Sequence, residues 1–232
     1  MRLFESGLLV ALDKPPGVSM ATSTREEKSA ARVVERLLAA CGEPHDEELR
    51  LVHRLDVGTS GVVILARGDA AHRELSRAFQ SGGARKVYRA LAWGHPTPAR
   101  GVCDEPLARD PKDGRRMRVA RGETGKRAVT RYETLARLPS VADLRLHPET
   151  GRTHQIRVHL SARGHPIVGD DLYGAGTRWR GVRSSSRRRA LAAISRPLLH
   201  AERVALPDLS VDVSAPLPSD YAGLLEVLGG DA

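Results

Sequence analysis

An acidic residue stands between two apolar stretches of this chain. Asp56 follows Leu51 and Val52 and precedes the β-branched run at residues 62–66, which reads as a buried strand. A lone carboxylate is costly to bury, so an acid in this place is paired, caps a turn or takes part in chemistry. Residues 58–61, Gly-Thr-Ser-Gly, are turn formers, and Asp56 could simply stabilise their turn. These residues alone leave the roles open.

The length and charge of the chain restrict its class. Its 232 residues suffice for one sizeable core, and we expect one catalytic domain over residues 1–232. The formal net charge of +9 favours a polyanionic partner. Nucleic acid fits better than a membrane, because no apolar run approaches the roughly 20 residues that a spanning helix needs. The two cysteines have no metal or redox spacing, so a cytoplasmic protein with free thiols is expected.

Hydrophobic periodicity predicts helices and strands in mixed order. One helix is expected to end at Cys41, after a stretch with capping-box spacing at residues 24–27. The other expected elements are strands at residues 8–12, 62–66, 85–94, 128–138, 141–146 and 211–215, and helices at 69–81, 153–164 and 219–228.

The strand at residues 85–94 carries an aromatic residue in a chain that has few. Its alternation places Lys86, Tyr88, Ala90 and Ala92 on one face. Tyr88 is therefore either a core residue with its hydroxyl at the rim or part of a binding surface.

Residues 99–126 are basic and rich in turns. The Asp-Gly pair at 113–114 predicts a hairpin, and Arg115, Arg116 and Arg118 follow it directly. Such a hairpin either contacts the polyanionic partner or is a charged edge that resists aggregation.

The helix expected from Thr153 to Gly164 has a polar face that includes His154 and Arg157. The spacing of His154 and His159 is poor for one helical face, and no third ligand completes a set, so we expect no metal site.

A second arginine-rich segment, residues 178–196, has seven arginines and no acid. We expect a mobile basic loop there, which either contacts phosphates or is simply solvated.

Taken together, the motifs resemble those of the RluA-type RNA pseudouridine synthases. The resemblance rests on Lys14-Pro15, on His-Arg-Leu-Asp with Thr-Ser-Gly at residues 53–61, on Lys-x-Tyr at 86–88, on Thr-Gly-Arg-x-His-Gln-Ile-Arg at 150–157 with Gly-x-Pro-Ile-x-Gly-Asp at 164–170, and on Leu-His-Ala at 199–201. They occur in the family's order and cover nearly the whole chain, without room for an N-terminal S4-type RNA-binding domain.

The resemblance implies a role for particular residues. Asp56 would be the catalytic carboxylate, and Arg157 would pair with it. Tyr88 would pack against the target uracil, with Leu198 or Leu199 opposite. Arg54 would enter the space that the extruded nucleotide vacates, although an ion pair with a nearby acid would also explain Arg54. Arg115, Arg116 and Arg118 of the expected hairpin would contact RNA, and we favour this role over that of a charged edge.

The resemblance also implies a fold and an activity. The fold would be α+β, a mixed and mainly antiparallel central sheet with flanking helices. The reaction would isomerise specific uridines of structured rRNA or tRNA to pseudouridine, with no cofactor and no metal. Asp56 could act as nucleophile at C1′ or as base toward C2′, and the sequence does not choose. We expect a cytoplasmic monomer.

Three other functions are compatible with parts of the sequence. An aspartyl phosphotransferase needs a second Asp where Gly58 stands, and a nucleophilic serine elbow needs a Gly where Val62 stands. A non-catalytic RNA-binding module would keep the arginines but would not need Asp56 and Arg157 together.

Overall fold

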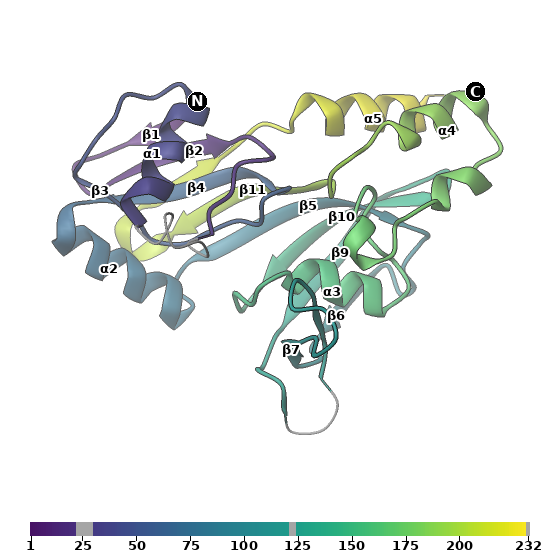
Figure 1. The fold of residues 1–232 in the computed structure, drawn as a ribbon, viewed down its shortest axis with the longest axis horizontal. Coiled ribbons are helices and arrows are strands. Elements are labelled where there is room, and N and C mark those ends of the chain that lie inside the picture. The colour runs from purple at the N-terminus through teal and green to yellow at the C-terminus, as the bar shows by residue number, and fades with distance from the viewer. Residues whose placement is uncertain (22–29, 121–123, 231–232) are drawn as a thin grey trace. The chain divides into compact units, whose positions relative to one another are not determined.

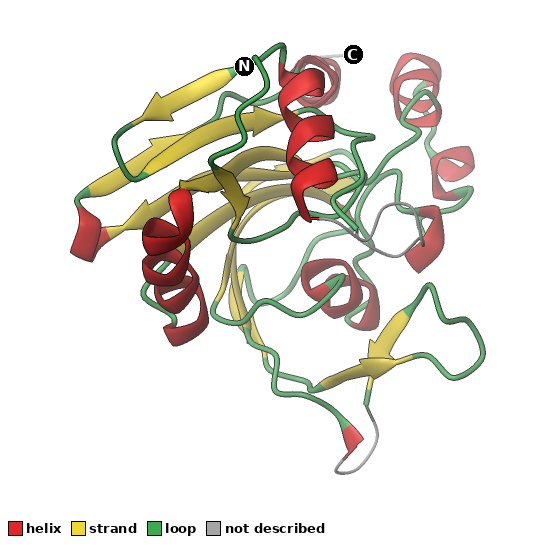
Figure 2. Cartoon of the chain, turned by 60° about the vertical axis from the view of Figure 1, so that its left-hand side comes forward, coloured by secondary structure: helices red, strands yellow, loops and turns green. Residues whose placement is uncertain are grey.

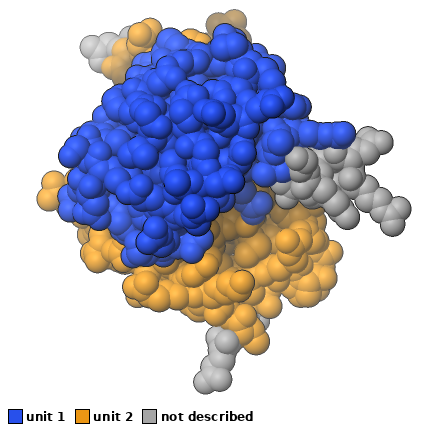
Figure 3. All heavy atoms as spheres, turned by 90° about the vertical axis from the view of Figure 1, so that its left-hand side faces the viewer, with its two compact units in different colours: residues 1–86, 201–216 blue, residues 87–200, 217–232 orange. Residues whose placement is uncertain are grey.

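The computed structural model describes residues 1–21, 30–120 and 124–230. The chain divides into two compact units (Figure 3). Unit 1 comprises Met1–Lys86 and Ala201–Pro216, and unit 2 comprises Val87–His200 and Leu217–Ala232. In both units helices flank the strands (Figure 2), which confirms the predicted α+β class with a mixed, mostly antiparallel sheet.

Unit 1 holds the N-terminal strands and helices (Figure 1). Its strands run in the order β1 (Arg2–Glu5), β2 (Leu9–Lys14), β4 (Ser60–Arg67) and β11 (Leu199–Leu206), with β3 (Leu49–Leu51) beside β4 and β12 (Val211–Ser214) beside β11. The pairs β1/β2, β2/β4, β3/β4 and β11/β12 are antiparallel. Its helices are α1 (Ala30–Cys41), α2 (Gly68–Ser81) and the short 3-10 turn η4 (Pro207–Leu209).

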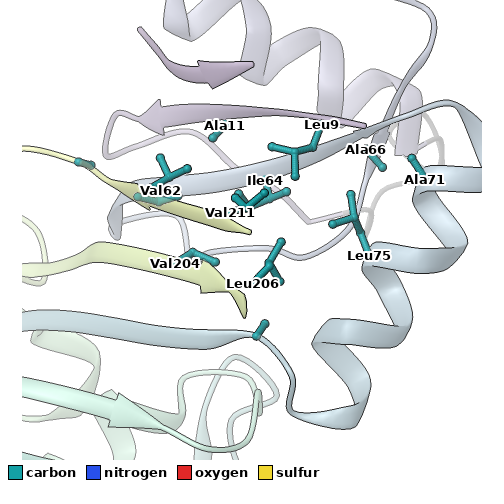
Figure 4. Packing of buried hydrophobic residues seen from close by; sticks show 13 residues of the cluster. Leu9, Ala11, Val62, Ile64, Ala66, Ala71, Leu75, Val204, Leu206 and Val211 are labelled. Carbon is teal, nitrogen blue, oxygen red and sulfur yellow. The ribbon is translucent and has the colours of Figure 1, made fainter. Parts of the chain in front are cut away.

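The core of unit 1 explains why two strands are apolar throughout. One face of β2 and β4, including Leu9, Val62 and Ile64, packs with Leu75 of α2 and with Val204 of β11 (Figure 4). The alternate residues of both strands are also buried. A strand buried on both faces needs a continuous apolar run rather than an alternating one.

Unit 2 has a second set of strands, in the order β5 (Arg85–Trp93), β10 (Val141–Pro148), β9 (Thr130–Leu138) and β6 (Arg100–Cys103), each neighbouring pair antiparallel. A separate pair joins β7 (Leu107–Arg109) and β8 (Met117–Val119). The helices are α3 (Gln155–Ala162), α4 (Ser185–Ala192) and α5 (Ser219–Gly229), with the 3-10 turns η2 (Asp171–Tyr173) and η3 (Arg178–Gly181).

The alternation predicted for β5 is confirmed by its packing. Tyr88, Ala90 and Ala92 lie in one cluster with Ile156 and Leu160 of α3. The other face of β5, with Leu91 and Trp93, packs against α5 through Tyr221 and Leu224.

One prediction about local structure is wrong, and one strand was missed. Residues 178–196 were expected to be a mobile loop, but they contain η3 and α4, where the Ser184 hydroxyl accepts a hydrogen bond from the Arg187 N–H. The segment becomes helical because Ser184 caps it and Leu191 reaches the core. Strand β1, which is mostly exposed, was not predicted. The capping box at residues 24–27 lies outside the described residues.

Candidate active site

Asp56 lies in the loop between β3 and β4 of unit 1, and its side chain is half-buried. Its carbonyl oxygen accepts a hydrogen bond from the Thr59 N–H at 3.0 Å, which closes a turn. Leu55 points inward with 6% of its surface exposed, and its N–H donates to Met20 Sδ. Arg54, before it, is exposed. Burial of Leu55 thus fixes the backbone on the N-terminal side of Asp56.

Lys14 anchors the other end of this loop from β2. Its side chain is fully buried, and its Nζ donates to the carbonyls of Pro15 at 2.9 Å and Val57 at 3.2 Å. The Gly17 N–H donates to the same Val57 oxygen at 2.8 Å. The Lys-Pro turn and the Asp56 loop are therefore one hydrogen-bonded structure, although Lys14 and Val57 are 43 residues apart in sequence.

His53 holds the loop to β4. Its Nε2 accepts a hydrogen bond from the Ile64 N–H at 2.9 Å, and its ring stacks on Phe79 with centroids 4.4 Å apart. Burial, together with the Lys86 cation, lowers the pKa of His53 to about 3. The imidazole is neutral at physiological pH with its proton on Nδ1, so its role here is to anchor the backbone.

Gly61, the last residue of the motif, is required by a close approach. It has φ +109°, and a Cβ there would lie 2.2 Å from the carbonyl oxygen of Ala201 in β11. Only glycine allows this backbone conformation and this contact together.

Arg157 lies in unit 2 on α3, where its guanidinium is buried. Its Nε and Nη2 donate to the two carboxylate oxygens of Asp170 at 2.7 and 2.8 Å. It also lies over the Tyr173 ring, 5.0 Å from the centroid. A bidentate pair fixes both the position and the plane of the guanidinium. Asp170 ends the Gly-x-Pro-Ile-x-Gly-Asp motif noted in the sequence, but neither Asp170 nor Tyr173 was predicted to have a role.

Gln155 was also missed, and it shapes the start of α3. Its Oε1 accepts hydrogen bonds from the Thr150 hydroxyl at 2.6 Å and the Arg152 N–H at 3.1 Å, and its Nε2 donates to Val129 O at 2.9 Å. His154 adopts the left-handed conformation with φ +55° just before the helix. The buried amide thus compensates for an irregular helix start.

Tyr173 connects α3 to the basic hairpin. Its hydroxyl accepts the Met117 N–H at 2.8 Å and lies 2.8 Å from His154 Nδ1. Arg116 of the hairpin lies over the same ring, 5.6 Å from its centroid. The predicted hairpin is confirmed, but it is packed against α3 rather than isolated.

The other two hairpin arginines have local partners. Arg115 forms an exposed ion pair with Asp113, which lowers the pKa of that carboxyl to about 2. Arg118 donates to the Val119 carbonyl at 3.3 Å.

The apolar residues proposed for the uracil pocket separate into two sets. Tyr88 is half-buried and lies in one cluster with Leu199. Leu198 is fully buried in the other cluster, with Leu91 and Tyr221. Consecutive strand residues face opposite sides, so only Leu199 lies on the side of Tyr88.

The histidines near α3 are engaged in separate hydrogen bonds. His159 contacts Thr130 Oγ1 and Glu105 O, each at 3.0 Å, and burial lowers its pKa. His165 Nδ1 lies 2.9 Å from Trp93 O. Within the described ranges, no three His, Cys, Asp or Glu side chains are grouped to hold a metal ion.

The described helices include none with the length and apolar character to cross a membrane.

The predicted site residues come from both units. Arg54 and Asp56 belong to unit 1, and Tyr88, Arg157 and Leu199 belong to unit 2. The pairing of Asp56 with Arg157 stays a prediction.

Comparison with known proteins identifies relatives of the whole chain. Residues 8–162 match a family model described as RNA pseudouridylate synthase. The dual-specificity RNA pseudouridine synthase RluA of Escherichia coli K12 is 36% identical over 222 residues, covering 94% of this chain and 93% of that protein. An uncharacterized RNA pseudouridine synthase of Mycobacterium bovis is 36% identical over 238 residues, covering 99% of this chain and 73% of that protein. The solved structure of human RNA pseudouridylate synthase domain containing 4 is 28% identical, with a TM-score of 0.76 and coverage of 98% and 92%.

Proposed function

Because the chain belongs to the RNA pseudouridylate synthase family, we propose that Asp56 is the carboxylate that isomerises specific uridines of rRNA or tRNA. The protein is an isomerase that converts uridine in RNA to pseudouridine. The observation that carries the proposal for Asp56 is its setting. Lys14, His53 and Gly61 hold the loop in place, and a half-buried acid stands within it.

The reaction breaks the bond from C1′ to N1 of the uracil and forms one from C1′ to C5. The proton on C5 is lost and one is gained at N1, so the product is an isomer and no redox partner is needed. An ionised Asp56 has two ways to start this reaction. It can attack C1′ as a nucleophile, or it can remove the proton at C2′.

Arg157 is proposed to pair with Asp56 and so to orient its carboxylate. Asp170 supports this role because it fixes the guanidinium through two hydrogen bonds. An arginine with a rigid orientation can offer a directed donor without first losing side-chain entropy.

Tyr88 is proposed to stack on the target uracil, with Leu199 as an apolar neighbour. Their common cluster supports this choice. The fully buried Leu198 would act indirectly, by supporting the strand that carries Leu199. Arg54 is exposed, which suits a side chain that enters the stack of the RNA when the nucleotide is extruded. Arg115, Arg116 and Arg118 are proposed to contact the RNA backbone.

We also propose that residues 1–232 act as one catalytic domain, as a monomer in the cytoplasm, without a cofactor. The free state of Cys41 and Cys103 is compatible with a reducing compartment. Light scattering of the purified protein tests the monomer.

The variant Asp56→Asn tests the catalytic proposal. Asn keeps the size of the side chain but can neither attack nor take a proton, so pseudouridine formation should fall by at least about a thousandfold. RNA affinity should stay within about threefold. The matched control is Asp69→Asn, which removes an exposed carboxylate that pairs with Arg50 in the same unit.

The measurement is pseudouridine mapping by carbodiimide-blocked primer extension on total rRNA and tRNA, with filter binding for affinity. Turnover by Asp56→Asn within about tenfold of the Asp69→Asn control would rule out the catalytic role. Modification of neither RNA class by the wild-type protein would rule out the proposed substrates.

A further inference from the structure

The excess positive charge of this chain is concentrated in one segment of unit 2. Residues 178–196 hold seven arginines and no acid, and the whole chain has a formal net charge of +9. All the remaining residues together therefore account for only two net positive charges. From residue 172 to residue 201 there is no acidic side chain at all.

This segment is a built structure, anchored on one side. Val182 and Leu191 are buried in the same cluster as Tyr221 of α5, and α4 lies beside α5 (Figure 1). Arg187 donates to Gly230 O at 2.6 Å, and Arg188 donates to Val182 O at 3.2 Å. These two arginines stabilise the fold of the segment.

Four other arginines of the segment point outward, and we call them the arginine surface: Arg178, Arg180, Arg183 and Arg189. Arg180 lies over the Trp179 ring, 5.4 Å from its centroid, and Arg178 donates to Gly174 O at 3.1 Å. Within residues 1–21, 30–120 and 124–230, none of the four pairs with a carboxylate.

Several exposed arginines elsewhere in the described chain are paired with acids. Arg100 lies 3.5 Å from Glu133, Arg131 lies 2.6 Å from Glu149, and Arg203 pairs with Asp212. Each of these cations is neutralised by an acid of the same unit. The arginine surface instead holds like charges in one segment, and their repulsion lowers the stability of the fold. Binding of an anion would neutralise these charges.

We infer that the arginine surface binds phosphates of the RNA substrate. This rests on the proposed function for the identity of the polyanion. Guanidinium groups suit phosphate, and each phosphate bound releases counterions. An acidic protein or an anionic membrane fits less well, because protein interfaces need apolar or aromatic anchors and interfacial helices need an exposed apolar face. The apolar residue of α4 that could serve, Leu191, is buried in the core.

The test is a triple variant of the arginine surface, Arg180→Gln, Arg183→Gln and Arg189→Gln. Its matched control removes the same charge from ion-paired positions: Arg100→Gln, Arg131→Gln and Arg203→Gln. RNA affinity is measured by filter binding from 50 to 300 mM KCl, with one transcript that the wild-type protein modifies. The single-turnover rate of pseudouridine formation is measured at saturating concentrations of the same RNA.

Loss of three phosphate contacts should weaken RNA binding by at least about tenfold at 100 mM KCl and reduce the slope of log K against log salt by about two. The control triple should change affinity by less than about threefold. Single-turnover rates at saturating RNA should be unchanged in both.

An equal loss of RNA affinity in the two triple variants would overturn the inference, because the change in total charge would then explain the loss. The inference would also be overturned if the arginine-surface triple variant bound RNA as tightly as the wild type does. The same holds if this variant kept its RNA binding but lost binding to polyglutamate or to anionic vesicles. Failure of the proposed function is separate. It appears as a wild-type protein that forms no pseudouridine in RNA, whatever the binding comparison gives.

Discussion

Two motifs of this chain are equally regular in sequence but are held in place by different forces. The Asp56 loop of unit 1 is fixed by backbone hydrogen bonds and close packing, through Lys14, His53 and Gly61. The Arg157 motif of unit 2 is fixed by a buried ion pair, with an aromatic ring beside it. The first motif surrounds its acid with groups that stay neutral or bond to the backbone, whereas the second is itself a network of charges.

The difference predicts how each motif responds to substitution. In the Asp56 loop, changing a supporting residue removes packing or a backbone bond, so stability should fall and activity should follow the folded fraction. In the Arg157 motif, removing one charge leaves the other buried without its partner. There, stability and the position of the guanidinium should change together.

The largest effect is expected for Asp170→Asn. Breaking this buried pair should lower the free energy of unfolding by about 3–5 kcal/mol. Among molecules that remain folded, kcat should fall at least about tenfold with little change in KM, because the guanidinium loses its fixed orientation. Urea denaturation and steady-state kinetics at a temperature where the variant is folded measure both.

The control is Asp212→Asn, which removes an acid from a surface pair with Arg203, both side chains being about half exposed. Such solvent-exposed pairs contribute little to stability. If Asp170→Asn is as stable and as active as Asp212→Asn, the contrast between the two motifs disappears.

A smaller effect is expected for Gly61→Ala in the Asp56 loop. The new Cβ would meet the Ala201 oxygen at 2.2 Å, in a backbone conformation with φ +109°. Overpacking and strain together should cost about 2–4 kcal/mol. Gly68→Ala is the matched control, because Gly68 also has positive φ but nothing within 4 Å of the added Cβ.

Chemical denaturation of both variants separates the cost of backbone strain from the cost of the close contact with Ala201. Gly68→Ala reports strain alone and should cost about 1 kcal/mol. The kcat of Gly61→Ala should stay close to the wild-type value per folded molecule. Equal stability of the two variants would mean that β4 and β11 can separate to admit a methyl group.

The parts of the fold that the sequence could predict are those set by local patterns. Strand β5 alternates regularly, and α2 ends at Ser81, the predicted end of that helix, with Gly82 in the left-handed conformation as its C-cap. Strand β1 could not be found this way, since it is a short and mostly exposed strand that forms by pairing with β2. Helix α4 was missed because its arginines gave no apolar face, and a single buried Leu191 anchors it.

The candidate site was predictable to a similar extent. The resemblance nominated Asp56 and Arg157, but the groups that orient Arg157 depend on tertiary contacts. Asp170 lies 13 residues beyond it, after the helix has ended. Tyr173 joins α3 to Met117, 56 residues away. No periodicity reports such contacts, since they arise when the η2 turn folds back along α3.

The smallest predicted effect is a dependence of stability on pH. It tests whether His53, which anchors the Asp56 loop, is neutral in the folded protein. His53 has a pKa of about 3 in the folded protein against an ordinary 6.5, so the unfolded chain binds one more proton in this range. Its contribution to stability is complete above pH 6.5 and is lost as the pH falls toward 3. Between pH 6 and pH 4.5, wild type should lose about 1 kcal/mol per pH unit more than His53→Gln.

The comparison between wild type and variant removes the titration of every other group, because those groups are common to both proteins. Urea denaturation at pH 7, 6, 5 and 4.5 gives the two slopes. A second measurement, ¹⁵N NMR of the ring, should find Nδ1 protonated and Nε2 unprotonated down to pH 5, since Nε2 accepts the Ile64 N–H. Parallel slopes, or a His53 ring that protonates near pH 6, would mean that charge as well as packing holds the Asp56 loop. The Asp56 loop and the Arg157 motif would then both depend on charge, and they would differ only in how strongly they do so.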